Sequence, residues 1–181
     1  MGFFSIFPFL ECRHSVWSMR HLVYGRMNVN GLEYLFQNAV GYWEGDEGRS
    51  FPREYAWTQC SFPGGSLMLA VADVPAAGFH FRGVIGVVLW KRREYRLATY
   101  LGARAVQVRG GRLRIVQGNL ELEARLLEKV RSPLKAPANG DMVRTIHENA
   151  ACRAFYAFRK GEYPLFSFTT DRASFEYELL E

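Results

Sequence analysis

The segment GYWEGDEGRSFP, residues 41–52, places three acidic residues beside aromatic ones, and two of these acids are candidates for chemistry. If a strand runs through residues 39–44, Tyr42 and Glu44 point to the same face of it. A carboxylate facing an apolar cavity is costly when ionised, so its pKa rises. An acid that keeps its proton beside an aromatic wall can protonate an alkene. Glu44 and Asp46 are therefore candidate acids.

The same segment has a second interpretation, in which Gly45, Glu47 and Gly48 form a solvated turn with the acids at its rim. Immediately after it, Ser50 and Phe51 precede a proline, which keeps Phe51 out of helical geometry. A rigid loop that leads into a strand accounts for this pattern. No nucleophile elbow surrounds Ser50, so nothing in the local sequence marks it as a nucleophile.

Further candidate ligand contacts lie in later strand-like segments. In YAWTQC, Trp57 and Gln59 share one face, and Gln59 either fixes a ligand by a hydrogen bond or satisfies neighbouring backbone groups. His80 lies between two phenylalanines in GFHFRG, where a structural or surface role competes with catalysis. Tyr100 belongs to the tyrosine-rich segment EYRLATYLG, which suits either a pocket wall or an ordinary core.

The elements that carry these residues are predicted to be strands, because apolar residues recur at every second position in residues 120–125, 152–159 and 174–179. Turn signals separate the runs, above all Asn30-Gly31, with glycine pairs or a Lys-Gly pair elsewhere. About ten strands joined by short hairpin loops indicate an antiparallel sheet. We predict an all-β fold with little helix, closed into a β-barrel that leaves no exposed edges.

Two segments are less regular. Residues 120–131 could form two or three helical turns, although the alternation through Ala124 favours a strand that ends near Glu128. Residues 131–140 contain Pro133 and Pro137 and are predicted to form a loop.

Composition narrows the classes of function. With 181 residues and a hydrophobic fraction of 49%, the chain is expected to form one globular domain over residues 1–181. The net charge is +5, but the basic residues are dispersed apart from a cluster at residues 91–96, and no nucleic-acid-binding motif accompanies them. Cys12, Cys60 and Cys152 are far apart and are expected to be reduced thiols. No Cys or His pair has the spacing of metal ligands, so neither a metal nor another cofactor is expected.

The location of the protein is predicted from its apolar runs. The longest, residues 84–90, is too short to span a bilayer. The opening MGFFSIFPFL has no basic residue ahead of its apolar stretch, and Ile6 stands where a myristoylation signal requires Ser or Thr. A cytoplasmic protein without a transmembrane segment is expected; peripheral membrane contact and the oligomeric state stay open.

Taken together, several blocks resemble the tocopherol cyclase-like family. GYWEGDEGRSFPREYAWTQC is similar to the family signature, and Gly45, Glu47 and Ser61 depart from it. Other blocks follow the family order, namely FPFLECRHSVWSMRH, GFHFRGVIG, EYRLATYLGA, PLKAP, MVRTIHE and DRASFEYE, the last in a form typical of bacterial members. The resemblance implies a lipocalin-like (calycin-type) barrel with an apolar cavity, corresponding to the second lobe of a two-lobed family.

The resemblance also implies roles for residues. Glu44 and Asp46 would be the acids, with Tyr42 and Gln59 as hydrogen-bonding partners, and Trp57 a wall whose π face stabilises cationic character. Ser50 and Phe51 match the signature as well, and His80 and Tyr100 lie in resembling blocks as candidate substrate contacts.

Three functional hypotheses follow from these features. The first is a cyclase- or hydratase-like enzyme that acts on an isoprenoid or another apolar substrate by acid–base chemistry. The second is a carrier of lipid or isoprenoid that uses the same cavity without catalysis. The third is a structural lobe that requires a partner half and exposes a large apolar surface.

Overall fold

The computed structural model describes residues 11–76, 79–128 and 132–178. Within them the chain forms twelve strands and a single 3-10 turn, η2 (Thr99–Leu101), so the all-β prediction with little helix is confirmed. The strands are β1 (Cys12–Val29), β2 (Leu32–Gly48), β3 (Tyr55–Phe62), β4 (Gly65–Ala76), β5 (Phe79–Trp90), β6 (Arg93–Ala98), β7 (Arg104–Arg109), β8 (Arg112–Gln117), β9 (Leu120–Leu126), β10 (Ser132–Ala138), β11 (Asp141–Lys160) and β12 (Tyr163–Glu178).

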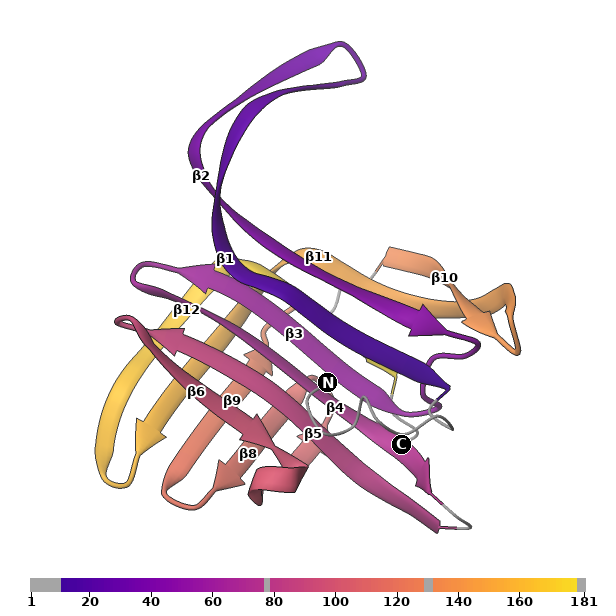
Figure 1. The fold of residues 1–181 in the computed structure, drawn as a ribbon, viewed down its shortest axis with the longest axis vertical. Helices are drawn as coiled ribbons and strands as arrows, with labels where there is room; N and C mark the ends of the chain where they lie inside the picture. Colours follow the sequence, from indigo (N-terminus) through magenta and orange to yellow (C-terminus); the bar gives the residue numbers. More distant parts are fainter. Residues whose placement is uncertain (1–10, 77–78, 129–131, 179–181) are drawn as a thin grey trace.

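Ten of the strands form one curved antiparallel sheet, and β1 and β2 form a separate two-stranded sheet (Figure 1). The order in the large sheet is β6-β5-β4-β3-β12-β11-β9-β8-β7. The strand β11 is long enough to pair with β10 along its first half and with β9 along its second half. The predicted hairpin turn at Asn30-Gly31 is confirmed, and both residues have the positive φ that such a turn requires, 53° and 85°.

The predicted closed barrel is corrected at one seam. Within the described residues no backbone ladder joins β6 to β7, the two ends of the sheet. A side chain bridges the seam instead: Gln117 Oε1 accepts a hydrogen bond from the backbone N–H of Ala98 at 2.9 Å, and its Nε2 donates to the carbonyl of Arg96 at 2.9 Å. The sheet is therefore curled like a barrel, and the side-chain amide of Gln117 links it across the gap.

The hydrophobic core lies on one face of the large sheet. On β4, Leu67, Leu69 and Val71 are buried in it, and the intervening residues point to the opposite face. Aromatic rings fill much of this core, with Phe62 and Phe168 at 4.6 Å between centroids and Phe158 and Phe166 at 5.7 Å. The interior expected to hold a ligand is packed with the protein's own side chains.

The β1–β2 hairpin has two parts with different surroundings (Figure 1). The part near its open end lies across the outer face of the large sheet, where Arg20 donates to the carbonyl of Gly65 at 3.2 Å. The part near the turn projects away from the sheet, and there Leu22, Tyr24 and Leu32 are 60–64% exposed. An exposed apolar surface of this kind is what the hypothesis of a lobe with a missing partner predicts.

The prediction of a loop over residues 131–140 is wrong. Residues Ser132–Ala138 form β10, which pairs with β11. Proline is tolerated there because β10 lies off the main path of the sheet and has β11 as its partner, so one edge of the strand needs no donors. The neighbouring ambiguity is resolved in favour of a strand, since β9 spans Leu120–Leu126.

The predictions about the opening segment fall on residues 1–10, outside the described residues. In the part of the chain that the structure describes, no helix has the length and apolar character needed to cross a membrane.

The bridge at the seam makes a testable prediction. Gln117→Leu leaves the N–H of Ala98 without its acceptor, and we expect the free energy of unfolding to fall by about 1–3 kcal/mol. Gln107→Leu, an exposed amide on the edge strand β7, is the matched control and should change stability by less than about 0.5 kcal/mol. Urea denaturation followed by circular dichroism measures both; equal losses would show that the bridge contributes nothing.

Candidate active site

A pocket of about 380 Å³ lies between the β1–β2 hairpin and the outer face of the large sheet. Its floor is made of small residues on neighbouring strands, Ala70 and Ala72 of β4 and Gly83 of β5, with Ala72 directly opposite Gly83. A side chain at Gly83 would meet Val74, since an added Cβ would lie 2.9 Å from Val74 Cγ2. The space exists because these residues are too small to fill the gap beneath the hairpin.

The walls of the pocket are mostly apolar. Trp57 of β3 and Ile85 of β5 stand on the sheet, and Phe51 closes the pocket from the loop that precedes β3. Phe51 packs edge-on against Tyr55, with 5.9 Å between ring centroids. Arg144 fixes this loop, because its guanidinium donates to the carbonyls of Phe51, Pro52 and Arg53 at 2.8–3.2 Å.

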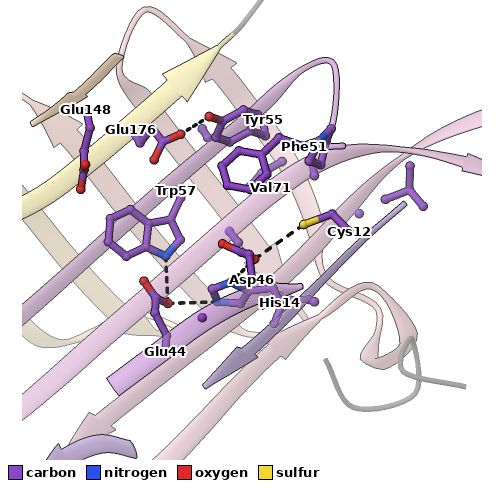
Figure 2. Close-up of a pocket in the computed structure, with 18 of the residues that line it drawn as sticks. Cys12, His14, Glu44, Asp46, Phe51, Tyr55, Trp57, Val71, Glu148 and Glu176 are labelled. Atoms are coloured by element: carbon purple, nitrogen blue, oxygen red, sulfur yellow. Dashed lines mark hydrogen bonds and ion pairs between the residues drawn. The ribbon is translucent and has the colours of Figure 1, made fainter. Parts of the chain in front are cut away.

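One side of the pocket holds a histidine between two acids, the His14 cluster, which consists of His14, Glu44 and Asp46 (Figure 2). The hairpin register places His14 of β1 directly opposite Asp46 of β2 and next to Glu44. His14 Nδ1 lies 3.0 Å from Asp46 Oδ1, and Nε2 lies 3.1 Å from Glu44 Oε2. The second contact lies outside good hydrogen-bond geometry, so it is mainly electrostatic.

The imidazole of His14 is an imidazolium at neutral pH, with a proton on each ring nitrogen. Burial by itself lowers the pKa of His14, but the hydrogen bond to Asp46 and the contact with Glu44 outweigh it and raise the pKa to about 9. Two further donors reach the same oxygen of Glu44, namely Tyr42 Oη at 2.5 Å and Trp57 Nε1 at 3.2 Å. Burial, and then the contact with Glu44, raises the pKa of Tyr42, which keeps this phenol neutral.

A thiol adjoins the His14 cluster. Cys12 Sγ lies 3.7 Å from Asp46 Oδ1 and donates to it weakly. Burial and the neighbouring Asp46 raise the pKa of Cys12 to about 12, so it is a thiol rather than a nucleophilic thiolate at neutral pH.

The other side of the pocket holds a buried acid, Glu176 of β12, to which Tyr55 Oη donates a hydrogen bond (Figure 2). Glu176 is only 9% exposed. Burial raises its pKa to about 7 against the opposing effect of the Tyr55 hydrogen bond, and the negative charges of Glu148, Asp46 and Glu178 act in the same direction as burial. Glu176 is thus divided between its acid and carboxylate forms near neutral pH.

The two sides of the pocket differ in their polar groups, with an imidazolium at one side and a buried carboxyl group of raised pKa at the other. The lining contains the acids Glu44, Asp46, Glu148 and Glu176 together with His14, and neither lysine nor arginine among the described residues. Such a pocket favours a molecule that is apolar overall and develops positive charge as it reacts. No group of three or more side chains suited to a metal ion occurs in the described ranges.

Four of the residues predicted from the sequence line this pocket: Glu44, Asp46, Phe51 and Trp57. Tyr42 lies beside it, bonded to Glu44, on the same face of β2 as predicted. The alternative of a solvated turn at residues 45–48 does not apply, because β2 continues through Gly48.

Four predicted residues lie outside the lining. Gln59 is buried and its Nε2 donates to Ser61 Oγ at 3.4 Å, whereas Ser50 Oγ accepts from the backbone N–H of Asn139 at 2.9 Å. His80 is exposed and pairs with Asp73, and Tyr100 lies in η2. Direct contact between these four and a molecule in the pocket is not supported by the arrangement.

Sequence reasoning missed His14, Tyr55, Glu148 and Glu176. A signal for His14 was present, since counting back from the Asn30-Gly31 turn pairs it with residue 47, one position from its actual partner Asp46. The register shift between Val23 and Gly25 is reversed by the shift between Ser18 and His21. The third shift, between Val16 and Ser18, accounts for the difference of one residue. For Glu176 the alternation gave the face, but it could not indicate that the face is covered.

The comparisons with known proteins cover part of the chain. No protein-family model matches it. Tocopherol cyclase of Zea mays, described as chloroplastic, is 36% identical over 66 residues, which make up 36% of this chain and 14% of that protein. The probable tocopherol cyclase of Oryza sativa subsp. japonica is 35% identical over 66 residues, with the same coverage. The chain is thus distantly similar to tocopherol cyclases over about a third of its length.

Among solved structures, kievitone hydratase from Nectria haematococca aligns with a TM-score of 0.48 and 12% sequence identity. The alignment covers 84% of this chain and 49% of that chain. The proteins found in the comparisons are therefore matched over half of their length or less.

The His14 cluster predicts how stability depends on pH. Because the pKa of His14 rises from its ordinary 6.5 to about 9 on folding, its contribution is fully present below pH 6.5 and is lost as pH rises through 9. We expect the wild type to lose about 2–3 kcal/mol of unfolding free energy across this range. His14→Gln should show little of this loss when melting is followed by circular dichroism.

His80→Gln is the matched control, since His80 is an exposed histidine that also pairs with an aspartate. It should retain the full pH dependence. The same pH dependence in wild type and His14→Gln would mean that His14 is not held as an imidazolium.

Proposed function

We propose that the protein is a cyclase- or hydratase-like enzyme that acts on an apolar small molecule in this pocket by acid–base chemistry. The observation that carries the proposal is one largely apolar pocket in which the His14 cluster faces the buried carboxyl group of Glu176. The distant similarity to tocopherol cyclases supports the same class of reaction.

The reaction class follows from what the pocket can supply. A carboxylic acid of the pocket gives its proton to one carbon of an alkene, so that the π electrons form the new C–H bond and the other carbon becomes cationic. The oxygen of a substrate hydroxyl, or of a water molecule, then bonds to the cation and loses its proton to the carboxylate. With a substrate hydroxyl the product is a ring of unchanged mass, and with water it is an alcohol.

The substrate class is an isoprenoid or a prenylated phenol. The apolar floor and walls suit a hydrocarbon chain, and a volume of about 380 Å³ is within the range of small-molecule sites. The indole of Trp57 offers its π face to a cation, and Glu44 accepts a hydrogen bond from its N–H at the ring edge. Both features stabilise positive charge that develops during the reaction more than they stabilise a neutral ground state.

A second candidate is a lobe that works together with a partner. The observation in its favour is the projecting part of the β1–β2 hairpin, where Leu22, Tyr24 and Leu32 are exposed. A two-stranded hairpin is marginally stable in water without a packing partner. In this case the pocket chemistry would be measured in the assembly rather than in the isolated chain.

The proposal is tested with 2-geranyl-1,4-hydroquinone as a probe, incubated with the protein in D₂O. Protonation of the alkene followed by ring closure should yield a cyclic ether that carries one deuterium bound to carbon, detected by mass spectrometry. Ala72→Leu fills the pocket floor and should abolish both the product and retention of the probe. Ala151→Leu, on an exposed position of β11, is the matched control and should behave as the wild type.

The outcomes separate the hypotheses. Retention of the probe without deuterated product would favour the carrier. If the protein neither retains the probe nor forms product, the hypothesis of an apolar ligand site in this pocket is contradicted.

A further inference from the structure

The sequence marks Glu44 and Asp46 as the candidate acids, yet both are already engaged by neighbouring donors. Glu44 Oε2 is approached by Tyr42 Oη, Trp57 Nε1 and the imidazolium of His14, all of which are donors. Asp46 accepts from His14 Nδ1 and from the thiol of Cys12. Both acids therefore use their oxygens as acceptors for groups of the protein itself.

Glu176 accepts a hydrogen bond from Tyr55 Oη, and its charged neighbours are acids. It is buried in the wall of the same pocket, directly across the sheet from Glu148 on β11 and from Trp57 on β3. The charged groups that raise its pKa are negative, Glu148, Asp46 and Glu178. A carboxyl group that is buried among other acids is stabilised in its protonated form.

The basic side chains near Glu176 have other partners. The guanidinium of Arg144 donates to the backbone carbonyls of residues 51–53, and it lies 5.9 Å from the centroid of the Tyr55 ring. His147 of β11 faces Glu178, with Nδ1 at 3.3 Å from Oε1. Tyr55 Oη donates to Glu176 Oε1, and burial and then the negative charge of Glu176 raise the pKa of this phenol, so it stays a neutral donor.

We propose that Glu176 is the proton donor of the pocket, and that Glu44 and Asp46 act as fixed negative charges that stabilise the cation. This inference rests on the proposed function and assigns its acid. Trp57 connects the two sides, since it is the cross-strand neighbour of Glu176 and its indole reaches Glu44 (Figure 2). An alkene that lies against Trp57 is therefore between the donor and the carboxylates.

The carboxyl group of Glu176 both donates the proton and accepts the one that is released. Its O–H bond breaks as the C–H bond of the alkene forms, and the carboxylate that results accepts the proton released when the hydroxyl oxygen bonds to the cation. Tyr55 keeps its hydrogen bond to Oε1 in both states and positions the carboxyl group.

The first test measures the proton without turnover. In protein labelled with ¹³C at the glutamate carboxyl carbon, NMR should reveal one carboxyl group that titrates near pH 7, as burial and the neighbouring acids require. That signal should be missing in Glu176→Gln. A Glu176 carboxyl group that titrates near pH 4 would overturn the inference, whatever the activity.

The second test uses the deuterated cyclisation of 2-geranyl-1,4-hydroquinone. Glu176→Gln should lower kcat by about 100-fold or more, whereas Glu176→Asp should retain part of the activity. The wild-type rate should fall as pH rises through about 7, because the donor is lost. Glu148→Gln should move this fall to lower pH, since it removes a negative neighbour of Glu176.

A merely structural role for Glu176 would not move the pH profile in Glu148→Gln. Full activity of Glu176→Gln with an unchanged pH profile would overturn the inference and leave the proposed function in place. If the wild type forms no product, the proposed function fails, and the donor role fails with it even where the NMR titration is as expected.

Discussion

The contact on which the site depends is the placement of His14 between Glu44 and Asp46. It joins the two strands of the hairpin at the point where the hairpin crosses the large sheet, and it holds the two acids at opposite nitrogens of one imidazole ring. The bulges in β1 and β2 determine this contact, because the register shift they introduce brings His14 opposite Asp46. Gly45 lies on the other face of the hairpin, where an added Cβ would meet the ring of Trp17 at 2.9 Å.

The large sheet uses its two faces for different purposes. Its inner face is packed with apolar and aromatic side chains, among them Phe62 and Phe158. Its outer face presents small residues beneath the hairpin, and the pocket forms there. The alternation of side chains along β4 makes this division possible, since Leu69 and Ala70 are neighbours in the chain and face opposite sides.

The acids of the pocket have the same chemical groups and different surroundings. Donors converge on Glu44 and Asp46, whereas Glu176 is buried beside other acids, which raises its pKa. The surroundings of each carboxyl group therefore depend on which strands lie against it. The hairpin supplies one set of neighbours, and β11 and β12 supply the other.

The sequence by itself determined the all-β class, the hairpin turn at Asn30-Gly31 and the shared face of Tyr42 and Glu44, because turn chemistry and side-chain alternation are local properties. The prediction of a loop over residues 131–140 relied on Pro133 and was wrong. Only the sheet order reveals that β10 is an edge strand, where proline is tolerated. The tertiary structure alone decided the position of the pocket and the protonation of Glu176. Both depend on burial and on charges brought by strands distant in sequence, and no local pattern encodes them.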